Sequence, residues 1–496
     1  MWSSCANSCE RAGDREHSGD GRGGREDRRE EESVTTGAGE GKGGRVGLAR
    51  RDRLLYCLGF FGFSLISYYF AFWLQKFYVP GMAGRTVLLT GGMFSLAVAL
   101  GRLTDGVYDP TIGYWSDRTR TRWGRRKPFM LLSIPVLLVT HLLLWHPPTA
   151  TASGANFAYL LVVQLVYFMA FTGYAGPYLA MLPELAETAQ DRASLATMQG
   201  LCSIGGLIAG GVLTTLLLPA LGFPGVAWVL AGLALVTMPL PLFISARHAA
   251  HPPEPSSQAL IPSIAAVLHN RPFRIYLVSQ VMFQGGMYVM VSAMPYLVQH
   301  RLHWQEGSAG ALSAVALLSG LCALPGVLQL SRRRGLKLAF LVSVGWFALT
   351  LPLLSTLGMW SSDAMNSAYA YFLIIVIGLA LGGLFAVPFA ILANITDYDR
   401  ARTGVNRQAL YFGVQGTALK AAQAGAPALA LTVLFLGSAQ SGQPPAPLGL
   451  TLLGPVTGVV AAISFLMFLR FPEHEVEAAV KAVHAGASAA EPVAGK

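Results

Sequence analysis

The segment Leu54–Gln75, LLYCLGFFGFSLISYYFAFWLQ, contains no charged residue and decides the class of fold. As a helix it is long enough to cross a hydrocarbon core about 30 Å thick. Comparable apolar runs recur along the chain as far as Leu469. Hydrophobic residues make up 53% of the 496 residues and charged residues only 12%, which is about half the charged fraction of an average soluble domain. The sequence therefore predicts an all-α protein that crosses the membrane many times.

The apolar runs predict twelve membrane-spanning helices. These cover residues 53–78, 86–115, 128–146, 156–184, 194–220, 224–246, 273–300, 307–331, 336–358, 366–396, 408–438 and 447–470. An even number of spans places both termini on one side of the membrane. Arginine and lysine concentrate in the short loops of one side, most densely in residues 117–127, whereas the opposite loops carry few. This asymmetry predicts a multi-pass protein of the cell membrane, plasma or inner, with both termini cytoplasmic.

The longest predicted inner loop, residues 247–272, divides the helices into two sets of six. It predicts an N-terminal half over residues 49–246 and a C-terminal half over residues 273–471. Two six-helix halves joined by a central linker are the plan of the major facilitator fold. Residues 1–48 are rich in Gly, Arg and Glu and poor in apolar residues, which predicts a disordered polar tail. Residues 472–496 are predicted to form a cytoplasmic tail.

Charged residues inside two predicted helices form the candidate functional site. The second helix contains GRLTDGVYDP at residues 101–110, with Arg102, Asp105 and Asp109, and the eleventh helix contains Lys420. An unpaired charge at the bilayer centre costs about 2.5–3.5 kcal/mol, so these groups must pair or line an aqueous cavity. Asp105 and Asp109 lie one turn apart on one helical face, where their repulsion favours the binding of a cation. The alternative is a fixed ion-pair lock between helices.

The same run carries a family resemblance. Residues 102–113, with the pattern RxxDxxxDPxxG, are followed by the basic loop TRTRWGRRKP at residues 119–128. This combination resembles the glycoside–pentoside–hexuronide:cation symporters, and the resemblance covers nearly all of residues 53–470. It implies a major facilitator fold that cotransports a small glycoside with H⁺, Na⁺ or Li⁺.

The resemblance also implies roles for the charged residues. By position, Asp105 and Asp109 would be the carboxylates of the cation site, with Thr172 beside them on the fourth helix. Lys420 would exchange partners with these carboxylates, and Arg102 would belong to the same network.

The chain departs from the family at the charged positions that hold the sugar in the relatives. A carboxylate position of the first helix falls on Ser64, one of the fourth helix falls on Ala175, and an arginine position of the fifth helix falls near Gln199 or Gly200. Tyr108 replaces an asparagine of the cation motif. Na⁺ needs several hard oxygen ligands, as other hard cations do, whereas a proton needs a single carboxylate. These departures favour H⁺ over Na⁺ as the coupling ion.

The sequence therefore predicts a secondary active transporter in the lipid bilayer. It would move a small polar solute, with a sugar or glycoside favoured, together with H⁺ by alternating access, and would work as a monomer. Polar and aromatic residues inside the helices are candidates for binding the solute: Ser64, Tyr68, Tyr174, Gln199, Gln284 and Gln415. The alternative role of such residues is packing between helices.

Two other functions stay open at this point. One is a carrier of amphipathic lipid-like or drug-like solutes, which the loss of sugar-binding charges would suit, and the other is a non-transporting sensor or scaffold. No enzyme is expected, because the sequence contains no HExxH or GxSxG motif. No Cys/His spacing typical of a metal site occurs, and no cofactor is expected. The net charge of +10 belongs to the inner loops rather than to a basic patch with aromatics, so nucleic acid is not an expected partner.

Overall fold

The computed structural model describes residues 49–82, 85–186, 189–244, 260–405, 407–437 and 444–479. The predicted polar tail over residues 1–48 lies outside the described residues, as do about half of the predicted linker and most of the predicted C-terminal tail. Within the described part every regular element is a helix, which agrees with the predicted all-α class. Eight helical stretches of this part are long and apolar enough to cross a membrane.

The helices follow the predicted apolar runs to within a few residues at most boundaries. In chain order they are α1 (Arg50–Tyr78), α2 (Gly91–Arg118), α3 (Lys127–Leu143), α4 (Gly154–Leu185), α5 (Ala189–Thr237), η1 (Leu240–Phe243), α6 (Leu260–His269), α7 (Arg271–Arg301), α8 (Ser308–Arg334), α9 (Leu336–Thr350), η2 (Leu351–Thr356), α10 (Asp363–Leu379), α11 (Leu381–Thr403), α12 (Gln408–Leu434) and α13 (Pro447–Leu469). The elements labelled η are short 3₁₀ helices.

The element α5 takes up two predicted helices, 194–220 and 224–246, in one continuous run. Its helical geometry is interrupted at Gly222, which has φ 64° and ψ 179°. A residue without a Cβ adopts this conformation at no steric cost. Pro219 and Pro224 flank the break, and a proline inside a helix removes a backbone hydrogen bond and favours a kink. The element α5 is therefore two helical segments joined by a tight bend.

The predicted helix 366–396 is divided in the structure into α10 and α11, which meet at Ala380. Here the backbone tightens locally, because the amide of Ala380 donates to the carbonyl of Ile377 and the amide of Gly383 donates to the carbonyl of Ala380. Such bonds to the third preceding residue are typical of 3₁₀ turns within or at the ends of helices. The two helices together form one apolar stretch of 41 residues from Asp363 to Thr403.

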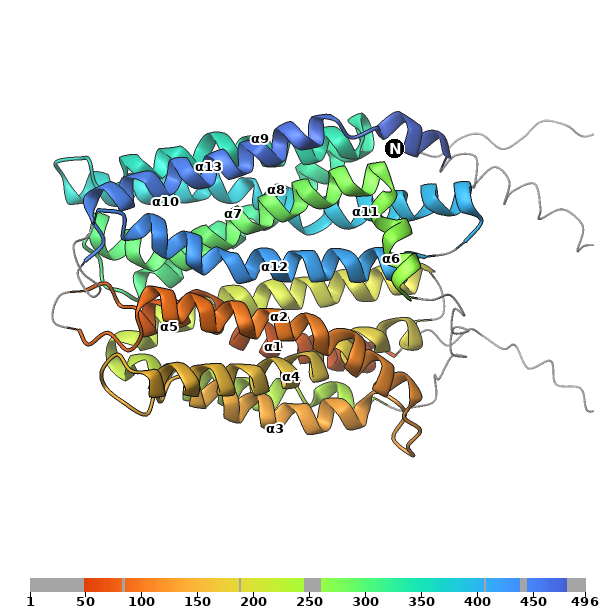
Figure 1. Cartoon of the computed structure of the whole chain (residues 1–496), viewed down its shortest axis with the longest axis horizontal. Helices are drawn as coiled ribbons and strands as arrows, with labels where there is room; N and C mark the ends of the chain where they lie inside the picture. Colours follow the sequence, from red (N-terminus) through yellow and green to blue (C-terminus); the bar gives the residue numbers. More distant parts are fainter. Residues whose placement is uncertain are drawn as a thin grey trace, which may run out of the picture. The chain divides into compact units, whose positions relative to one another are not determined.

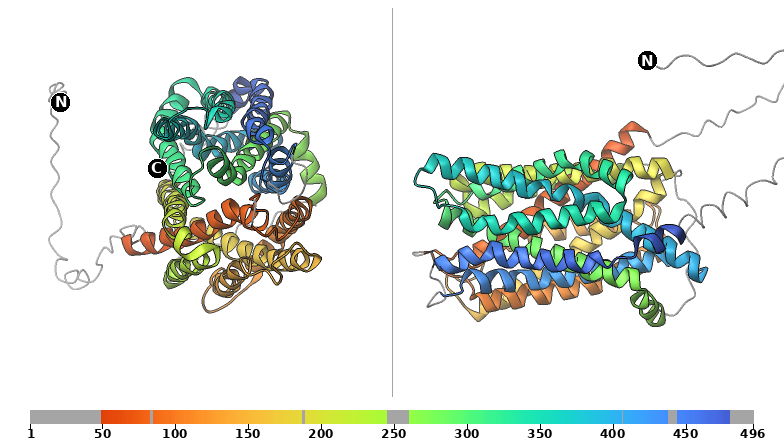
Figure 2. Two further views of the ribbon diagram at one scale, coloured as in Figure 1. Left: turned by 90° about the vertical axis from the view of Figure 1, so that its left-hand side faces the viewer. Right: turned by 90° about the horizontal axis from the view of Figure 1, so that it is seen from above.

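The long helices lie side by side in a bundle, with their axes roughly along one direction (Figure 1). One group is formed by α1 packed on α5, and by α4 packed on α2 and α3. A second group is formed by α7 packed on α12 and α13, and by α8 packed on α10 and α11. Figure 2 shows the two groups end-on, one in orange to yellow and the other in green to blue. They meet along α2 and α12, α5 and α8, and α1 and α7.

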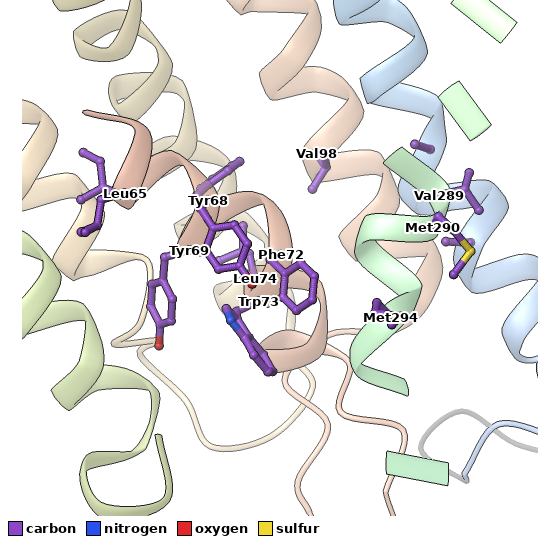
Figure 3. Packing of buried hydrophobic residues seen from close by; sticks show 14 of the residues in the cluster. Leu65, Tyr68, Tyr69, Phe72, Trp73, Leu74, Val98, Val289, Met290 and Met294 are labelled. Carbon is purple, nitrogen blue, oxygen red and sulfur yellow. The ribbon is translucent and has the colours of Figure 1, made fainter. Parts of the chain in front are cut away.

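An aromatic cluster fixes α1 in the first group. Tyr69 and Trp73 of α1 are fully buried, and Figure 3 shows them among the packed residues of this helix. The rings of Tyr69 and Trp145 have centroids 4.3 Å apart, and the ring of Trp145 is stacked at 5.8 Å on that of Phe223. Stacked and tilted aromatic pairs add to the stability gained from burial alone. This packing holds α1 against α5 and against the turn that follows α3.

Polar contacts join the two groups at the end of the bundle where α1 finishes. Arg85 forms an ion pair with Glu306 at 2.7 Å. The hydroxyl of Thr215 on α5 donates to the carbonyl of Gly307 at 2.7 Å, and the hydroxyl of Tyr296 on α7 donates to the carbonyl of Val79. These contacts all connect residues that are far apart in the sequence, and together they fasten one group to the other at this end.

Candidate functional site

Asp105, Asp109 and Thr172 form the acidic part of the site. The two aspartates lie one turn apart on α2, and α4 packs against α2 and brings Thr172 beside them. The hydroxyl oxygen of Thr172 lies 2.8 Å from Oδ1 of Asp105 and 3.2 Å from Oδ1 of Asp109. The side chain of Asp105 is fully buried, whereas that of Asp109 is 48% exposed. A solute ion or proton can therefore reach Asp109 more directly than Asp105.

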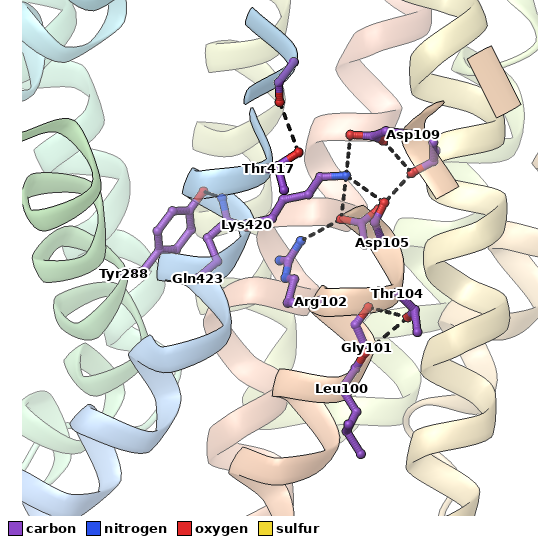
Figure 4. Close-up of polar contacts among 12 residues, drawn as sticks. Leu100, Gly101, Arg102, Thr104, Asp105, Asp109, Tyr288, Thr417, Lys420 and Gln423 are labelled. Carbon is purple, nitrogen blue, oxygen red and sulfur yellow. Dashed lines mark hydrogen bonds and ion pairs between the residues drawn. The ribbon is translucent and has the colours of Figure 1, made fainter. Parts of the chain in front are cut away.

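Lys420 supplies the positive charge from the other group of helices. Its Nζ atom lies 3.1 Å from Oδ2 of Asp105 and 2.7 Å from Oδ2 of Asp109, and it also donates to the backbone carbonyl of Asp105 at 3.1 Å. Figure 4 shows the side chain reaching from α12 to both carboxylates of α2. Two of these contacts, to Oδ2 of Asp109 and to the carbonyl of Asp105, are hydrogen bonds, and the contact with Oδ2 of Asp105 is an ion pair without hydrogen-bond geometry.

Arg102 lies one turn before Asp105 on α2. Its guanidinium nitrogen NH1 is 3.7 Å from Oδ2 of Asp105, a distance too long for a strong hydrogen bond. The guanidinium also lies over the ring of Phe168, 4.5 Å from its centroid, which is a favourable cation–π distance. Arg102, Lys420, Asp105 and Asp109 together make a cluster of two cations and two anions whose formal charges sum to zero. The sequence analysis assigned these four residues to one network. In the structure each of them contacts at least one other member of the cluster.

This arrangement can exchange a cation for the ammonium of Lys420. Carboxylate and hydroxyl oxygens are suitable ligands for a hard cation, and a proton on Asp109 would weaken that residue's attraction to Lys420. Among the described residues, no group of three or more His, Cys, Asp or Glu side chains could hold a metal ion. The carboxylates and the hydroxyl of this cluster are the groups at which a cation or a proton would compete with Lys420 for the contact between α2 and α12.

Two of the residues proposed to bind the solute, both tyrosines, are placed in contacts between helices. Tyr174 is fully buried, and its hydroxyl lies 3.0 Å from the carbonyl oxygens of Gly59 and Met238. The hydroxyl of Tyr68 lies 2.5 Å from that of Ser313. These two tyrosines hold α1 to its neighbours with the polar ends of their side chains.

The other candidates for binding the solute are spread over several helices. The hydroxyl of Ser64 on α1 lies 2.8 Å from that of Ser203 on α5. The amide nitrogen of Gln415 donates to the hydroxyl of Tyr276 at 2.8 Å, and Gln415 is buried. Gln199 and Gln284 are partly exposed on α5 and α7. Their role in binding stays a prediction, because the structure does not gather the six candidates in one place.

A pocket opens beside the charged cluster, between α1, α2, α7 and α12. Its polar lining consists of Gln75, Arg102, Tyr288, Ser292 and Gln423, and the remaining lining is apolar. Sequence reasoning assigned Arg102 to the charged network, but it did not single out Gln75, Ser292 or Gln423. The spacing of some of the other lining residues could have indicated that they share a helix face with a site residue or with each other. Gln423 follows Lys420 by three residues, and Tyr288 and Ser292 are four residues apart. Residues at such spacings lie on one face of a helix.

Comparisons with known proteins find relatives among transporters. A family model described as MFS/sugar transport protein matches residues 55–472. An isoprimeverose transporter of Lactiplantibacillus pentosus is 22% identical over 379 residues, which cover 72% of this chain and 74% of that protein. An uncharacterized symporter of Synechocystis is 31% identical over 177 residues, which cover 35% of this chain and 31% of that protein.

A solved structure gives the same fold. The nucleoside transporter NupG matches with a TM-score of 0.58 at 11% sequence identity, over 85% of this chain and 99% of that chain. At this identity the match concerns the fold alone. The family match reaches from α1 to α13 and includes every member of the charged cluster, and it confirms the resemblance to glycoside–pentoside–hexuronide:cation symporters. The chain is thus a multi-pass membrane transporter rather than an enzyme, and it belongs to the MFS/sugar transport protein family.

Proposed function

We propose that this protein is a proton-coupled symporter that moves a sugar or glycoside across the cell membrane by alternating access. It would work as a monomer with twelve spans, and both termini would face the cytoplasm. Two helix groups would rock against each other around a solute held between them. The family match and relatives named as symporters support transport. We propose in addition that the coupling ion is a proton and that the solute is a sugar or glycoside.

The observation that carries the proposal is the contact of Lys420 with both Asp105 and Asp109. Lys420 belongs to one helix group and the two aspartates belong to the other. When no cation is bound, the ammonium neutralises the carboxylates and ties α12 to α2. A proton on Asp109 removes one of these attractions, so proton binding changes the relative stability of the two arrangements of the groups. Such a difference is what couples a cation to a conformational change.

The oxygen atoms available at the site support a proton over Na⁺. Asp105, Asp109 and Thr172 supply side-chain oxygens, and Lys420 already takes up the space between the carboxylates. Tyr108, at the position for which the family resemblance implies an asparagine, is partly buried on the same helix. A hard metal cation needs more oxygen ligands than a proton does. Protonation requires only the half-exposed carboxyl group of Asp109.

The proposed span count rests on the two irregular elements. The apolar stretch Gln190–Phe243, which includes most of α5 and all of η1, has 54 residues and a bend at Gly222, so it is long enough for two crossings, and the joined α10 and α11 make one long crossing. With α9 and η2 counted together, the described helices other than α6 then supply twelve spans. The isoprimeverose transporter among the relatives and the polar pocket between the groups support a sugar-like solute.

Transport by the purified full-length protein in proteoliposomes tests the proposal. Radiolabelled isoprimeverose and a panel of other sugars are offered with an imposed proton gradient or an imposed Na⁺ gradient. Only the proton gradient is expected to drive accumulation. Asp109→Asn should abolish accumulation while keeping downhill exchange, because its neutral side chain resembles the protonated acid. Asp363→Asn, at an exposed aspartate in the first turn of α10, is the matched control and should transport normally.

Two results would count against the proposal. If Asp109→Asn still moves protons with the solute at the wild-type ratio, the carboxylate is a structural element and the coupling mechanism is wrong. If lipid-like solutes are accumulated and sugars are not, the coupling can stand but the solute class is wrong.

A further inference from the structure

We infer that the C-terminal end of α2 and the loop that follows it, residues 114–123, bind the headgroup of an anionic phospholipid. The lipid phosphate would contact the arginines of this segment, and the aromatic residues of the segment would lie at the level of the headgroups. The segment belongs neither to the charged cluster nor to the pocket beside it. This inference rests on the proposed orientation of the chain in the membrane, but not on the proposed ion or solute.

One face of α2 is directed away from the bundle. Large apolar side chains on this helix are exposed at intervals of three, four or seven residues, which places them on one face: Leu96, Leu100, Leu103, Val107 and Tyr114. Asp105 is buried and lies on the opposite face, since it precedes Tyr114 by nine residues, or about two and a half turns. The exposed face is therefore the one that would contact lipid.

Arg118 continues this face at the end of the helix. It follows Tyr114 by about one turn, and its guanidinium lies 3.8 Å from the centroid of the Tyr114 ring. The neighbouring Trp115 is also exposed. Tyrosine and tryptophan are enriched where a membrane helix passes from the hydrocarbon core into the headgroup layer. The exposed face of α2 thus changes along its length from aliphatic to aromatic and then to basic, as the layers of a lipid leaflet require.

A compact turn presents two further arginines beyond the helix. The hydroxyl of Thr121 accepts from the amide of Trp123 at 3.2 Å and donates to the carbonyl of Gly124 at 2.7 Å. Gly124 has φ 95°, a backbone conformation that favours glycine. Trp123 is 50% exposed, and the guanidinium of Arg122 lies 5.4 Å from its ring centroid. The turn therefore holds an arginine beside an exposed ring, and Arg120 is exposed as well.

The arginines of this loop divide into a paired set and an unpaired set. Residues 117–127 contain six basic residues and one aspartate. Arg125 and Arg126 form ion pairs with Glu184 at 3.0 and 3.2 Å, so they hold the loop to the end of α4. The other three form no ion pair with any residue that the structure describes: Arg118, Arg120 and Arg122. The unpaired set is available to a phosphate.

An anionic lipid fits this patch better than a dissolved anion does. The guanidinium group matches the geometry of a phosphate, and the cytoplasmic leaflet carries anionic lipids that attract basic segments next to spanning helices. The exposed rings beside Arg118 and Arg122 suit the boundary between headgroups and hydrocarbon, which a dissolved anion does not need. A bound lipid would thus anchor α2, the helix that also carries Asp105 and Asp109.

Native mass spectrometry of the purified full-length protein tests this inference, because it gives the dissociation constant of the first lipid that binds. The probes are dioleoylphosphatidylglycerol and dioleoylphosphatidylcholine, which share their acyl chains and differ in charge. An arginine near the membrane surface contributes about fivefold to the binding of an anionic lipid. Phosphatidylglycerol is therefore expected to bind the wild type about tenfold or more tightly than phosphatidylcholine, and millimolar inorganic phosphate should not displace it.

Two variants that lose the same charge locate the site. The loop variant combines Arg118→Gln, Arg120→Gln and Arg122→Gln and should bind phosphatidylglycerol about tenfold or more weakly than wild type. The matched control replaces with glutamine the three arginines in the last turn of α8, Arg332, Arg333 and Arg334. These arginines are exposed, but α8 contains no aromatic residue. The control should bind phosphatidylglycerol within about threefold of wild type.

Trp123→Ala keeps every arginine and removes the exposed ring of the turn. It should weaken the binding of both lipids and preserve the preference for phosphatidylglycerol. Unchanged binding of both lipids by this variant would refute the part assigned to the ring.

Three results would overturn the lipid site itself. They are equal affinity of the wild type for the two lipids, an equal loss of binding in the loop variant and the α8 control, and displacement of phosphatidylglycerol by inorganic phosphate. None of these measurements involves transport, so a failure of the lipid site and a failure of the proposed symport are distinguishable.

Discussion

The ammonium nitrogen of Lys420 lies 2.7 Å from Oδ2 of Asp109 and 3.1 Å from Oδ2 of Asp105, so one side chain of α12 neutralises two carboxylates of α2. The two helices belong to different groups of the bundle. This contact lies between groups that must move relative to each other during transport, and it is also the contact that a bound cation would alter. Its energetics can therefore be tested separately from transport.

The double substitution of Lys420 and Asp109 tests this pairing. Lys420→Ala leaves Asp109 without its cation and Asp105 with only the more distant Arg102, and removal of one partner from a buried pair costs about 3–5 kcal/mol. The cost should lie at the lower end of this range, because Asp109 is 48% exposed. Adding Asp109→Asn should recover part of the loss. Thermal unfolding of the purified variants in nanodiscs measures both effects, and a double variant no more stable than Lys420→Ala would contradict the pairing.

Thr172 gives a second test, in which only a hydroxyl group is changed. Thr172→Val keeps the shape of the side chain but removes the donor to Asp105 and Asp109. A hydrogen bond to a charged group contributes about 1.5–3 kcal/mol, so proton-driven uptake should fall by about tenfold or more, and Thr172→Ser should retain it. Thr457→Val is the control, because the hydroxyl of Thr457 is buried against carbonyls of its own helix. Equal uptake by Thr172→Val and wild type would show that the hydroxyl has no part in coupling.

The ion pair between Arg85 and Glu306 is expected to help keep the two helix groups together at the C-terminal end of α1. Arg85→Ala removes a contact between the two groups, and an exposed pair contributes at most about 1 kcal/mol. A cysteine at Ser292, within the pocket, should then react up to about fivefold faster with an impermeant maleimide in a background without native cysteines. Arg125→Ala is the control, since Arg125 pairs with Glu184 inside one group. An unchanged rate in Arg85→Ala would show that this pair does not hold the end closed.

Reporter fusions test the topology. Fusions after Arg122, within residues 247–272 and after Lys496 should report the cytoplasm. Fusions near Pro147 and Gly437 should report the opposite side, because an odd number of spans separates each of them from the inner loops. A consistent reversal at one of the inner positions would refute the twelve-span arrangement.

The charged cluster could be predicted from the sequence because three of its residues are close together in the chain and because an unpaired charge in a membrane is costly. Arg102, Asp105 and Asp109 lie within eight residues of one apolar helix, and charges in a membrane must pair. Lys420 is a basic residue within another long apolar helix, and the family resemblance indicated Thr172. The structure places all five in contact through α2, α4 and α12. The spacing of charged residues along one helix and the high cost of an unpaired charge in the membrane were sufficient to predict this part of the site.

The solute pocket could not be predicted in the same way. A tyrosine or glutamine inside a membrane helix is satisfied by whichever group faces it, and that group comes from a distant segment. Tyr174 donates to backbone carbonyls of α1 and the end of α5, and Gln415 donates to Tyr276 of α7. Gln75, which lines the pocket, could not be distinguished from them by spacing. The fold class was predictable because it does not depend on which distant segments meet. A long apolar run has few alternatives to a helix in a bilayer.

The zero sum of charge on Arg102, Asp105, Asp109 and Lys420 has an electrical consequence. The empty transporter would reorient without carrying charge on these residues across the membrane, so the membrane voltage would do no work on this step. A proton bound together with an anionic solute would also move as a neutral pair. A proton bound with a neutral sugar would carry one charge, and 100 mV would then contribute about 2.3 kcal/mol to accumulation, or about fiftyfold. The current that accompanies uptake therefore reports the charge of the solute.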